Sequence, residues 1–102
     1  MADVIYEGQR VLLENKVYLL GVPTDPDIVR CLVRRPGGSL ITLTYPDEAL
    51  TRREEGFYEA AVVVDEGGTW GVRWEAAGTV DAVNEISFQV VSSIVAAITT
   101  GR

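Results

Sequence analysis

The 102-residue sequence contains no histidine and only one cysteine. Without histidine, the chain cannot form the Ser–His or Cys–His pairs used by nucleophilic enzymes, or a histidine metal site. The single Cys31 excludes an internal disulfide, which fits assembly in an intracellular compartment. Long apolar runs are also missing. Ile94–Ile98 is far shorter than the ~20 residues needed to cross a bilayer.

Positive charge is scarce as well. Nine Lys and Arg residues stand against fifteen Asp and Glu residues, so the formal net charge is −6. A negative domain repels phosphate backbones and anionic lipids, so we expect neither nucleic acid nor membrane as a partner. The first residues carry Asp3 and lack a basic segment followed by an apolar one, so we expect no secretory signal and a soluble protein.

The residues that are abundant favour strands. Fifteen valines, six isoleucines and eight threonines are β-branched, and such side chains fit a pleated strand better than a helix. Glycine and proline recur at short intervals, which is typical of short strands joined by turns. The pattern predicts one all-β domain, a sandwich of seven or eight antiparallel strands.

Alternation of apolar and polar residues locates the strands. In residues 27–35, Val29, Cys31 and Val33 share one face and are predicted to point into the core, whereas Arg30 and Arg34 point to solvent. The predicted strands cover residues 9–14 and 16–20 (one strand, broken or bulged near Asn15), 27–35, 40–45, 50–53, 57–65, 69–75 and 84–91. Residues 46–55 and 91–99 are the only candidate helices, and 76–82 form a predicted loop.

Further inward faces follow from the same alternation: Tyr58, Ala60, Val62 and Val64; Trp70, Val72 and Trp74; Ile86, Phe88 and Val90. The two tryptophans have two interpretations. They could form a platform on which a sugar stacks, or they could fill the core between the sheets. The opposite face of that strand carries Arg73 and Glu75, which favours the core.

Carboxylate pairs occur in four predicted turns: Asp25/Asp27, Asp47/Glu48, Glu54/Glu55 and Asp65/Glu66. Glycoside hydrolysis needs two carboxyl groups facing each other, one with a raised pKa. Calcium needs six to eight oxygen ligands. Neighbouring Pro and Gly residues favour solvated turn charges over both, with the arginines paired to Glu54, Glu55 and nearby acids. We therefore predict no catalytic residue, no metal and no cofactor, and Cys31 as a small apolar residue.

Both ends of the chain carry apolar residues that invite burial, either against the domain itself or against a partner. Near the N-terminus these are Val4, Ile5 and Tyr6, and in the C-terminal segment they are Ile94, Val95 and Ile98. We take these six residues as the candidate partner interface.

The order of several motifs resembles a known family. The motifs are Asp25-Pro26-Asp27-Ile28-Val29, Pro36-Gly37-Gly38, Gly56-Phe57-Tyr58, Gly68-Thr69-Trp70 followed by Arg73-Trp74, Gly78, and Glu85 followed by Phe88-Gln89-Val90. In this order they resemble the short immunoglobulin-like β-sandwich proteins among the virion structural genes of tailed bacteriophages and gene-transfer particles. The match covers roughly residues 9–91.

The resemblance implies an immunoglobulin-like antiparallel β-sandwich of about seven strands over residues 9–91. An N-terminal arm (1–8) precedes it, and an apolar tail (92–102), an arm or a short helix, follows it. It also implies a non-enzymatic virion structural protein, assembled in the host cytoplasm, such as a capsid decoration, fibre-base, neck or tail accessory protein. Its partners would be other virion subunits, in a homo-oligomer or in multiple copies. The alternative is a displayed module that binds a ligand or carbohydrate.

Overall fold

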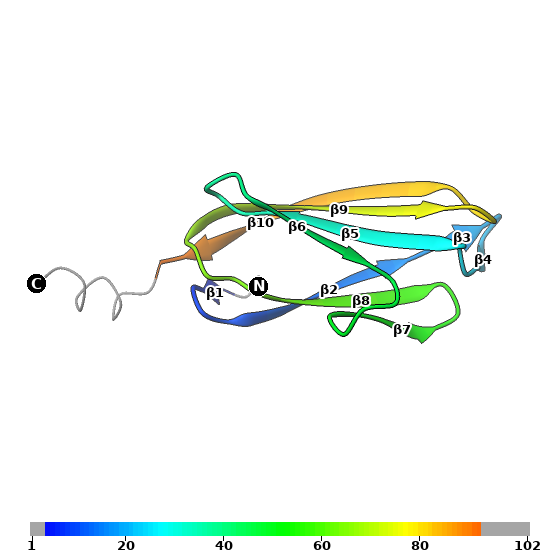
Figure 1. The fold of residues 1–102 in the computed structure, drawn as a ribbon, viewed down its shortest axis with the longest axis horizontal. Coiled ribbons are helices and arrows are strands. Elements are labelled where there is room, and N and C mark those ends of the chain that lie inside the picture. The colour runs from blue at the N-terminus through cyan, green and yellow to red at the C-terminus, as the bar shows by residue number, and fades with distance from the viewer. Residues whose placement is uncertain (1–3, 93–102) are drawn as a thin grey trace, which may run out of the picture.

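The computed structural model describes residues 4–92, which form ten strands and no helix, hence no helix that could span a membrane. The strands are β1 (Ile5–Tyr6), β2 (Arg10–Lys16), β3 (Tyr18–Leu19), β4 (Val22–Pro23), β5 (Ile28–Arg34), β6 (Leu40–Thr44), β7 (Leu50–Glu54), β8 (Phe57–Val63), β9 (Gly68–Ala77) and β10 (Ala82–Val91). Figure 1 shows them as two layers.

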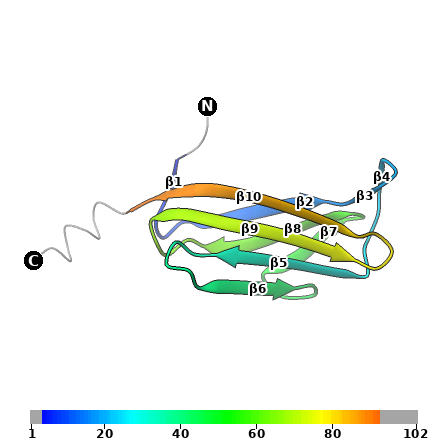
Figure 2. The same cartoon turned by 90° about the horizontal axis from the view of Figure 1, so that it is seen from above.

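The two layers are sheets of different width. The five-stranded sheet has the order β1-β10-β9-β5-β6, and the three-stranded sheet has the order β2-β8-β7. Strands β3 and β4 form a separate hairpin. In Figure 2, the strands of the larger sheet lie side by side from β10 to β6. The prediction of an all-β sandwich is confirmed, and the immunoglobulin-like strand order remains a prediction.

The core lies between the sheets and contains most of the predicted inward faces. Val29, Cys31 and Val33 of β5 are buried, as are Tyr58, Ala60, Val62 and Val64 on the other sheet. Trp70 and Trp74 are 0% and 1% exposed. Trp70 stacks on Phe88, with ring centroids 6.2 Å apart. The core interpretation of the tryptophans is confirmed, and the sugar platform is wrong.

The predicted first strand differs from the structure. Strand β2 runs through Asn15 without a break and ends at Lys16. Strand pairing is then interrupted at Val17, whose side chain is buried with Ala76 and Val80. The Val17 N–H donates to the Gly56 carbonyl, and the Val17 carbonyl accepts from Thr24 N–H. These bonds hold both sides of a short hairpin, β3–β4, that replaces the second half of the predicted strand.

Two further segments correct the prediction. The strand predicted at 50–53 is confirmed as β7, and the alternative of a helix over 46–55 is wrong, because Leu50 is fully buried in the core and pairs with Ala60 of β8. The predicted loop 76–82 is shorter than expected. Strand β9 continues to Ala77, because its pairing with β5 extends to Ile28.

Ile86 was predicted to lie in the core, but 45% of its surface is exposed. It pairs in register with Val72, so both side chains lie on the inner face of the larger sheet, yet Val72 is only 3% exposed. The difference arises because a three-stranded sheet covers less width than a five-stranded one. The middle of β10 therefore projects beyond the core.

One pairing is parallel, and it involves a strand in the predicted N-terminal arm, whereas the strand pairings within residues 9–91 are antiparallel as predicted. Ile5 and Tyr6 of β1 pair with Val90 and Val91 of β10 in parallel. After β1 the chain crosses to the other sheet, where Gly8 N–H donates to the Val64 carbonyl. No hairpin joins β1 to β10, so nothing imposes the antiparallel direction on this short strand.

The two tryptophans are expected to respond differently to replacement by phenylalanine. The Trp70 indole N–H donates to the Glu66 carbonyl at 2.9 Å, whereas the Trp74 indole N–H is buried without a partner in residues 4–92. A buried donor without an acceptor costs about 1–3 kcal/mol, which Trp74→Phe removes. Urea unfolding should therefore show a smaller loss of stability for Trp74→Phe than for Trp70→Phe. An equal or larger loss for Trp74→Phe would contradict this account.

Candidate interaction surfaces

Asp25 connects three segments of the chain. It lies between β4 and β5, and its carboxylate accepts hydrogen bonds from Gly56 N–H (2.8 Å) and the Tyr58 hydroxyl (3.0 Å). The Arg52 guanidinium of β7 binds both carboxylate oxygens, with Nη2 2.9 Å from Oδ2. The ring of Tyr45 packs edge-on against Tyr58, 5.4 Å between centroids. Asp25 thus fastens the β4–β5 connection to both strands of the β7–β8 hairpin.

These partners stabilise the charged form of Asp25. The Arg52 guanidinium, followed by the Gly56 N–H, lowers the pKa of Asp25 to about 2. Burial raises the pKa of Tyr58 to about 12, and the neighbouring Asp25 adds to this shift. The hydrogen bonds from Arg52, Gly56 and Tyr58 all favour the ionised carboxylate, and together they hold the β4–β5 connection in place.

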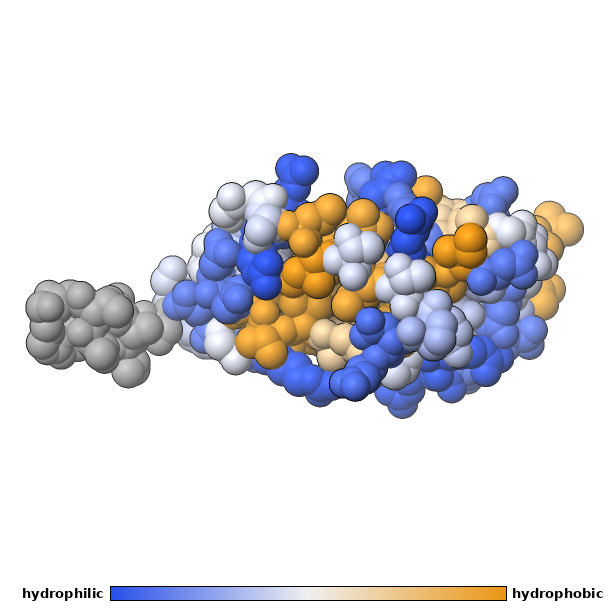
Figure 3. All heavy atoms as spheres, viewed as in Figure 1, coloured by the Kyte–Doolittle hydropathy of each residue, from blue (hydrophilic) through white to orange (hydrophobic). Residues whose placement is uncertain are grey.

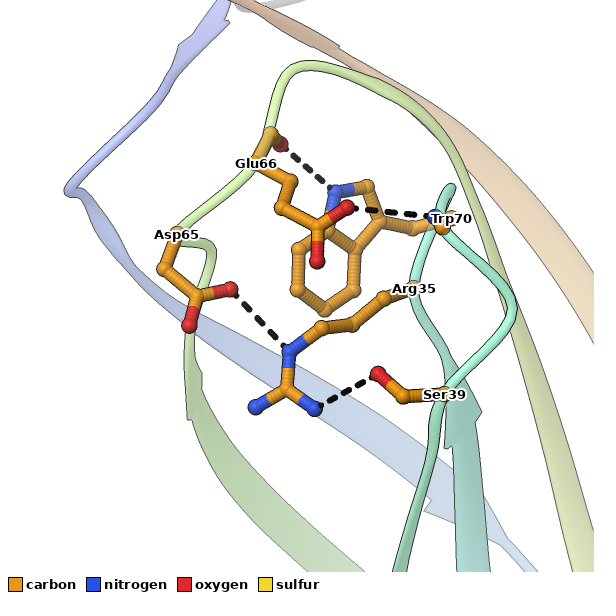
Figure 4. A network of polar contacts seen from close by, with 6 residues as sticks. Arg35, Ser39, Asp65, Glu66 and Trp70 are labelled. Carbon is orange, nitrogen blue, oxygen red and sulfur yellow. Dashed lines mark hydrogen bonds and ion pairs between the residues drawn. The ribbon is translucent and has the colours of Figure 1, made fainter.

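A second network ties two turns together at the other end of the sandwich (Figure 4). Arg35 donates from Nε to Asp65 (3.1 Å) and from Nη1 to the Ser39 hydroxyl (3.0 Å). Glu66 accepts from Gly37 N–H at 3.1 Å. The predicted turn between β5 and β6 is thereby joined to the turn between β8 and β9.

Ion pairs also cross the outer face of the five-stranded sheet. Arg73 of β9 contacts Glu75 on its own strand and Glu85 of β10, both at 2.8 Å, and Glu75 contacts Arg30 of β5 at 3.2 Å. Exposed pairs of this kind contribute little stability each. Arg34, on the same face, makes no side-chain hydrogen bond or ion pair within residues 4–92.

The structure corrects the predicted roles of the turn charges. Asp25, Asp27, Asp65 and Glu66 bind neighbouring loops and are not simply solvated; Asp27, for example, accepts from Thr79 N–H at 3.0 Å. The ion pairs of the arginines are made with carboxylates other than Glu54 and Glu55. Arg52 pairs with Asp25, and Arg53 pairs with Glu59 across the β7–β8 hairpin.

Groups that could carry chemistry are buried or dispersed. Burial raises the pKa of the Cys31 thiol to about 12, so the thiol stays protonated and behaves as a core side chain. Across residues 4–92, no three His, Cys, Asp or Glu side chains gather in a way that could hold a metal ion.

A hollow of about 360 Å³ lies on the outer face of the five-stranded sheet. Gly71 lies beside Arg34 in the ladder, and because it has no side chain it leaves space between its neighbours. Leu32 and Leu40 give the hollow an apolar lining, and Arg34, Arg73 and Glu85 also line it. A Cβ atom on Gly71 would approach nothing closer than 4.0 Å.

The β3–β4 hairpin forms an apolar projection, here called the hairpin tip and made of Tyr18, Leu19, Leu20 and Val22. Leu20 is 95% exposed, and its backbone has a φ of 51°, in the left-handed region. Figure 3 shows hydrophobic residues at the end of the molecule where β3 and β4 lie in Figure 1. This hairpin was not predicted from the sequence. Its two-residue turn is Leu20-Gly21, whereas Asn-Gly is the pair that marks such a turn in a sequence.

The residues of the predicted partner interface lie near the opposite end of the sandwich. Val4 and Tyr6 are more than half exposed, whereas Ile5 is partly buried against the core. Ile94, Val95 and Ile98 lie outside the described residues. The described residues extend over 55 × 29 × 20 Å, so the hairpin tip and β1 are far apart (Figure 1).

Comparisons with known proteins inform the fold only. No family model matches the chain, and no curated protein matches it either. A solved structure from Bacteroides vulgatus, of a protein assigned as a glycoside hydrolase, superposes with a TM-score of 0.60 and 16% sequence identity. The match covers 90% of this chain but 17% of that protein. This likeness supports the β-sandwich fold.

Replacement of Asp25 should change how stability depends on pH. The folded-state pKa is about 2, below the ordinary 3.8, so the stabilisation is present above pH 3.8 and is lost as the pH falls toward 2. The side chain is 37% exposed, so solvent reduces the gain to about 1 kcal/mol. Asp25→Asn should lower the free energy of unfolding by that amount at pH 7. Denaturant titrations at a series of pH values should also show that the stability of the variant falls less steeply below pH 3.8. Asp65→Asn, in a single exposed ion pair, is the control and should lose less.

Proposed function

We propose that the chain is a non-enzymatic structural subunit that binds other proteins of a virion or gene-transfer particle. The observation that carries the binding role is the exposed Leu20 at the hairpin tip. The polar groups of the sandwich mostly brace loops against one another, which leaves exposed apolar surface as the means of contact. The virion setting rests on the resemblance of the motifs over residues 9–91.

Leu20 supports this role because its backbone conformation and its exposure both lower the stability of the fold. A left-handed backbone costs a non-glycine residue roughly 1–2 kcal/mol. An almost fully exposed leucine gains no burial energy in return. A polar residue such as asparagine would suit the turn better. An apolar residue held in strain at the end of a projection fits a contact made with another molecule.

Exchange of Leu20 for asparagine should raise stability while lowering binding. Asparagine tolerates the left-handed conformation and completes the Asn-Gly turn, so the free energy of unfolding should rise by up to about 1 kcal/mol. Incorporation into particles produced from the encoding genome should fall at least severalfold. Urea unfolding and quantitative mass spectrometry of purified particles measure the two effects.

Leu12→Asn is the control, because Leu12 is likewise an exposed leucine, with about half of its surface accessible, but it lies on the outer face of the three-stranded sheet. It should leave incorporation unchanged. If Leu20→Asn is incorporated as well as the unchanged chain, the hairpin tip is not the contact. If the unchanged chain is absent from purified particles, the virion role itself is wrong.

The hollow around Gly71 favours a second candidate function, the displayed ligand-binding module. Its apolar lining and the unpaired Arg34 suit a small ligand with an apolar face and a carboxylate, such as an acidic sugar. Buried Trp70 and Trp74 have no part in this site.

Filling the hollow tests this second candidate. Gly71→Val should keep or raise stability, because valine favours strands and the added Cβ meets no close contact. Calorimetric titration with a panel of acidic sugars and their neutral counterparts should show binding of an acidic sugar to the unchanged chain and none to Gly71→Val. Binding that survives in Gly71→Val, or that ignores the carboxylate, would contradict this site.

A further inference from the structure

The edges of the two sheets are protected unequally. In the three-stranded sheet, β7 carries Arg52, Arg53 and Glu54 and has an irregular register, and β2 carries three charged residues of its seven. Charges and bulges of this kind prevent an edge strand from pairing with another chain. The five-stranded sheet lacks such protection, because β6 has no charged residue and β10 has only one.

Of these two edges, β10 is the longer and the more regular. It has ten residues against five in β6, and its ladder with β9 runs from Ala82 to Val90 without a bulge. Strand β1 covers only Val90 and Val91 (Figure 2). Within residues 4–92, no strand pairs with the outer side of residues 82–88, here called the open edge.

The hydrogen-bonding groups of the open edge can be assigned from one contact. Glu7 N–H donates to the Val91 carbonyl at 2.8 Å, so the peptide groups of Val91 point away from β9. Backbone groups alternate in direction along a strand. The N–H and C=O groups of four further residues therefore point outward: Val83, Glu85, Ser87 and Gln89.

We propose that the open edge of β10 pairs antiparallel with the same edge of a second copy of this chain, about a two-fold axis at Ile86. This deepens the proposed function by naming one partner of the subunit, and the edge geometry that carries it is separate from the hairpin tip. Pairing would join two five-stranded sheets into one continuous sheet.

Three features of the sequence select this register. With the axis at Ile86, Glu85 faces Ser87 of the second copy on both sides of the axis, through backbone groups that no strand of residues 4–92 uses. Val83 would face Gln89, whose carbonyl lies toward Ile5 N–H in the parallel pairing of β1, so full pairing in this register displaces the short strand β1 from Gln89 and Val90. An axis at Glu85 would place two glutamates opposite each other, which is unfavourable. An axis at Ser87 would displace β1 completely, because it also requires the Val91 carbonyl that accepts from Glu7 N–H.

The same register covers apolar surface that the fold leaves exposed. The two Ile86 side chains would face each other in a non-hydrogen-bonded pair, where side chains approach most closely. Each is 45% exposed in the single chain. Arg73 already holds Glu85 at 2.8 Å, so the one charge of the edge is balanced before a second copy arrives.

Opposite charges placed at Ser87 test both the pairing and its register. Ser87 is exposed and its neighbour on β9 is Gly71, so either substitution has room to fit. Ser87→Glu puts a carboxylate opposite Glu85 of the second copy, twice per dimer, whereas Ser87→Lys puts an ammonium group there. We expect the dimer dissociation constant to rise about tenfold in Ser87→Glu and to stay equal or fall in Ser87→Lys.

Sedimentation equilibrium of the full chain measures the dimer dissociation constant. Protein concentrations from ~10 μM to ~1 mM suit the weak affinity expected of a small interface. A dimer of the unchanged chain with opposite responses of the two variants supports the proposal. A monomer throughout overturns it, as does a dimer that both variants weaken equally or leave unchanged. Incorporation into particles is measured separately, so a monomer that still enters particles would refute the self-pairing and not the proposed function.

Discussion

A five-stranded sheet packs on a three-stranded one, and this mismatch in width decides which apolar side chains are buried. Strand β9 lies inside the larger sheet, between β10 and β5, and its two tryptophans fill the core. Strand β10 lies at the margin of that cover: Val90 is buried and Phe88 packs against the core, but Ile86 keeps nearly half of its surface although it shares a face with buried Val72. A wider second sheet would bury Ile86 and reduce the exposed apolar surface of β10.

Polar side chains brace the two ends of the sandwich. At one end Asp25 holds the β4–β5 connection on the β7–β8 hairpin, and at the other Arg35 and Glu66 join two turns. These groups lie between loops, where they replace contacts that a small core cannot supply. The surfaces that we propose for recognition are the hairpin tip, the hollow at Gly71 and the open edge of β10.

Local patterns predicted most of the fold. Alternation located the inward face of β5 and both core tryptophans, because a strand with one buried face repeats every two residues. Ile86 was misplaced because alternation reports the face of a strand but not how far the opposite sheet extends. Asp25 was taken for a solvated charge since its partners, Arg52 and Tyr58, are 27 and 33 residues away. The hairpin tip was missed because Leu20 replaces the polar residue that marks such turns.

Amide hydrogen exchange along β10, followed by NMR at increasing protein concentration, tests the central claim that the open edge is the surface where a second copy adds. The amides of Ile86 and Phe88 bond to β9 and should be protected at every concentration. Those of Val83, Glu85, Ser87 and Gln89 should exchange fast in dilute solution and become protected as the concentration rises. Exchange that stays fast at all concentrations, or protection that is already complete in dilute solution, would contradict the account.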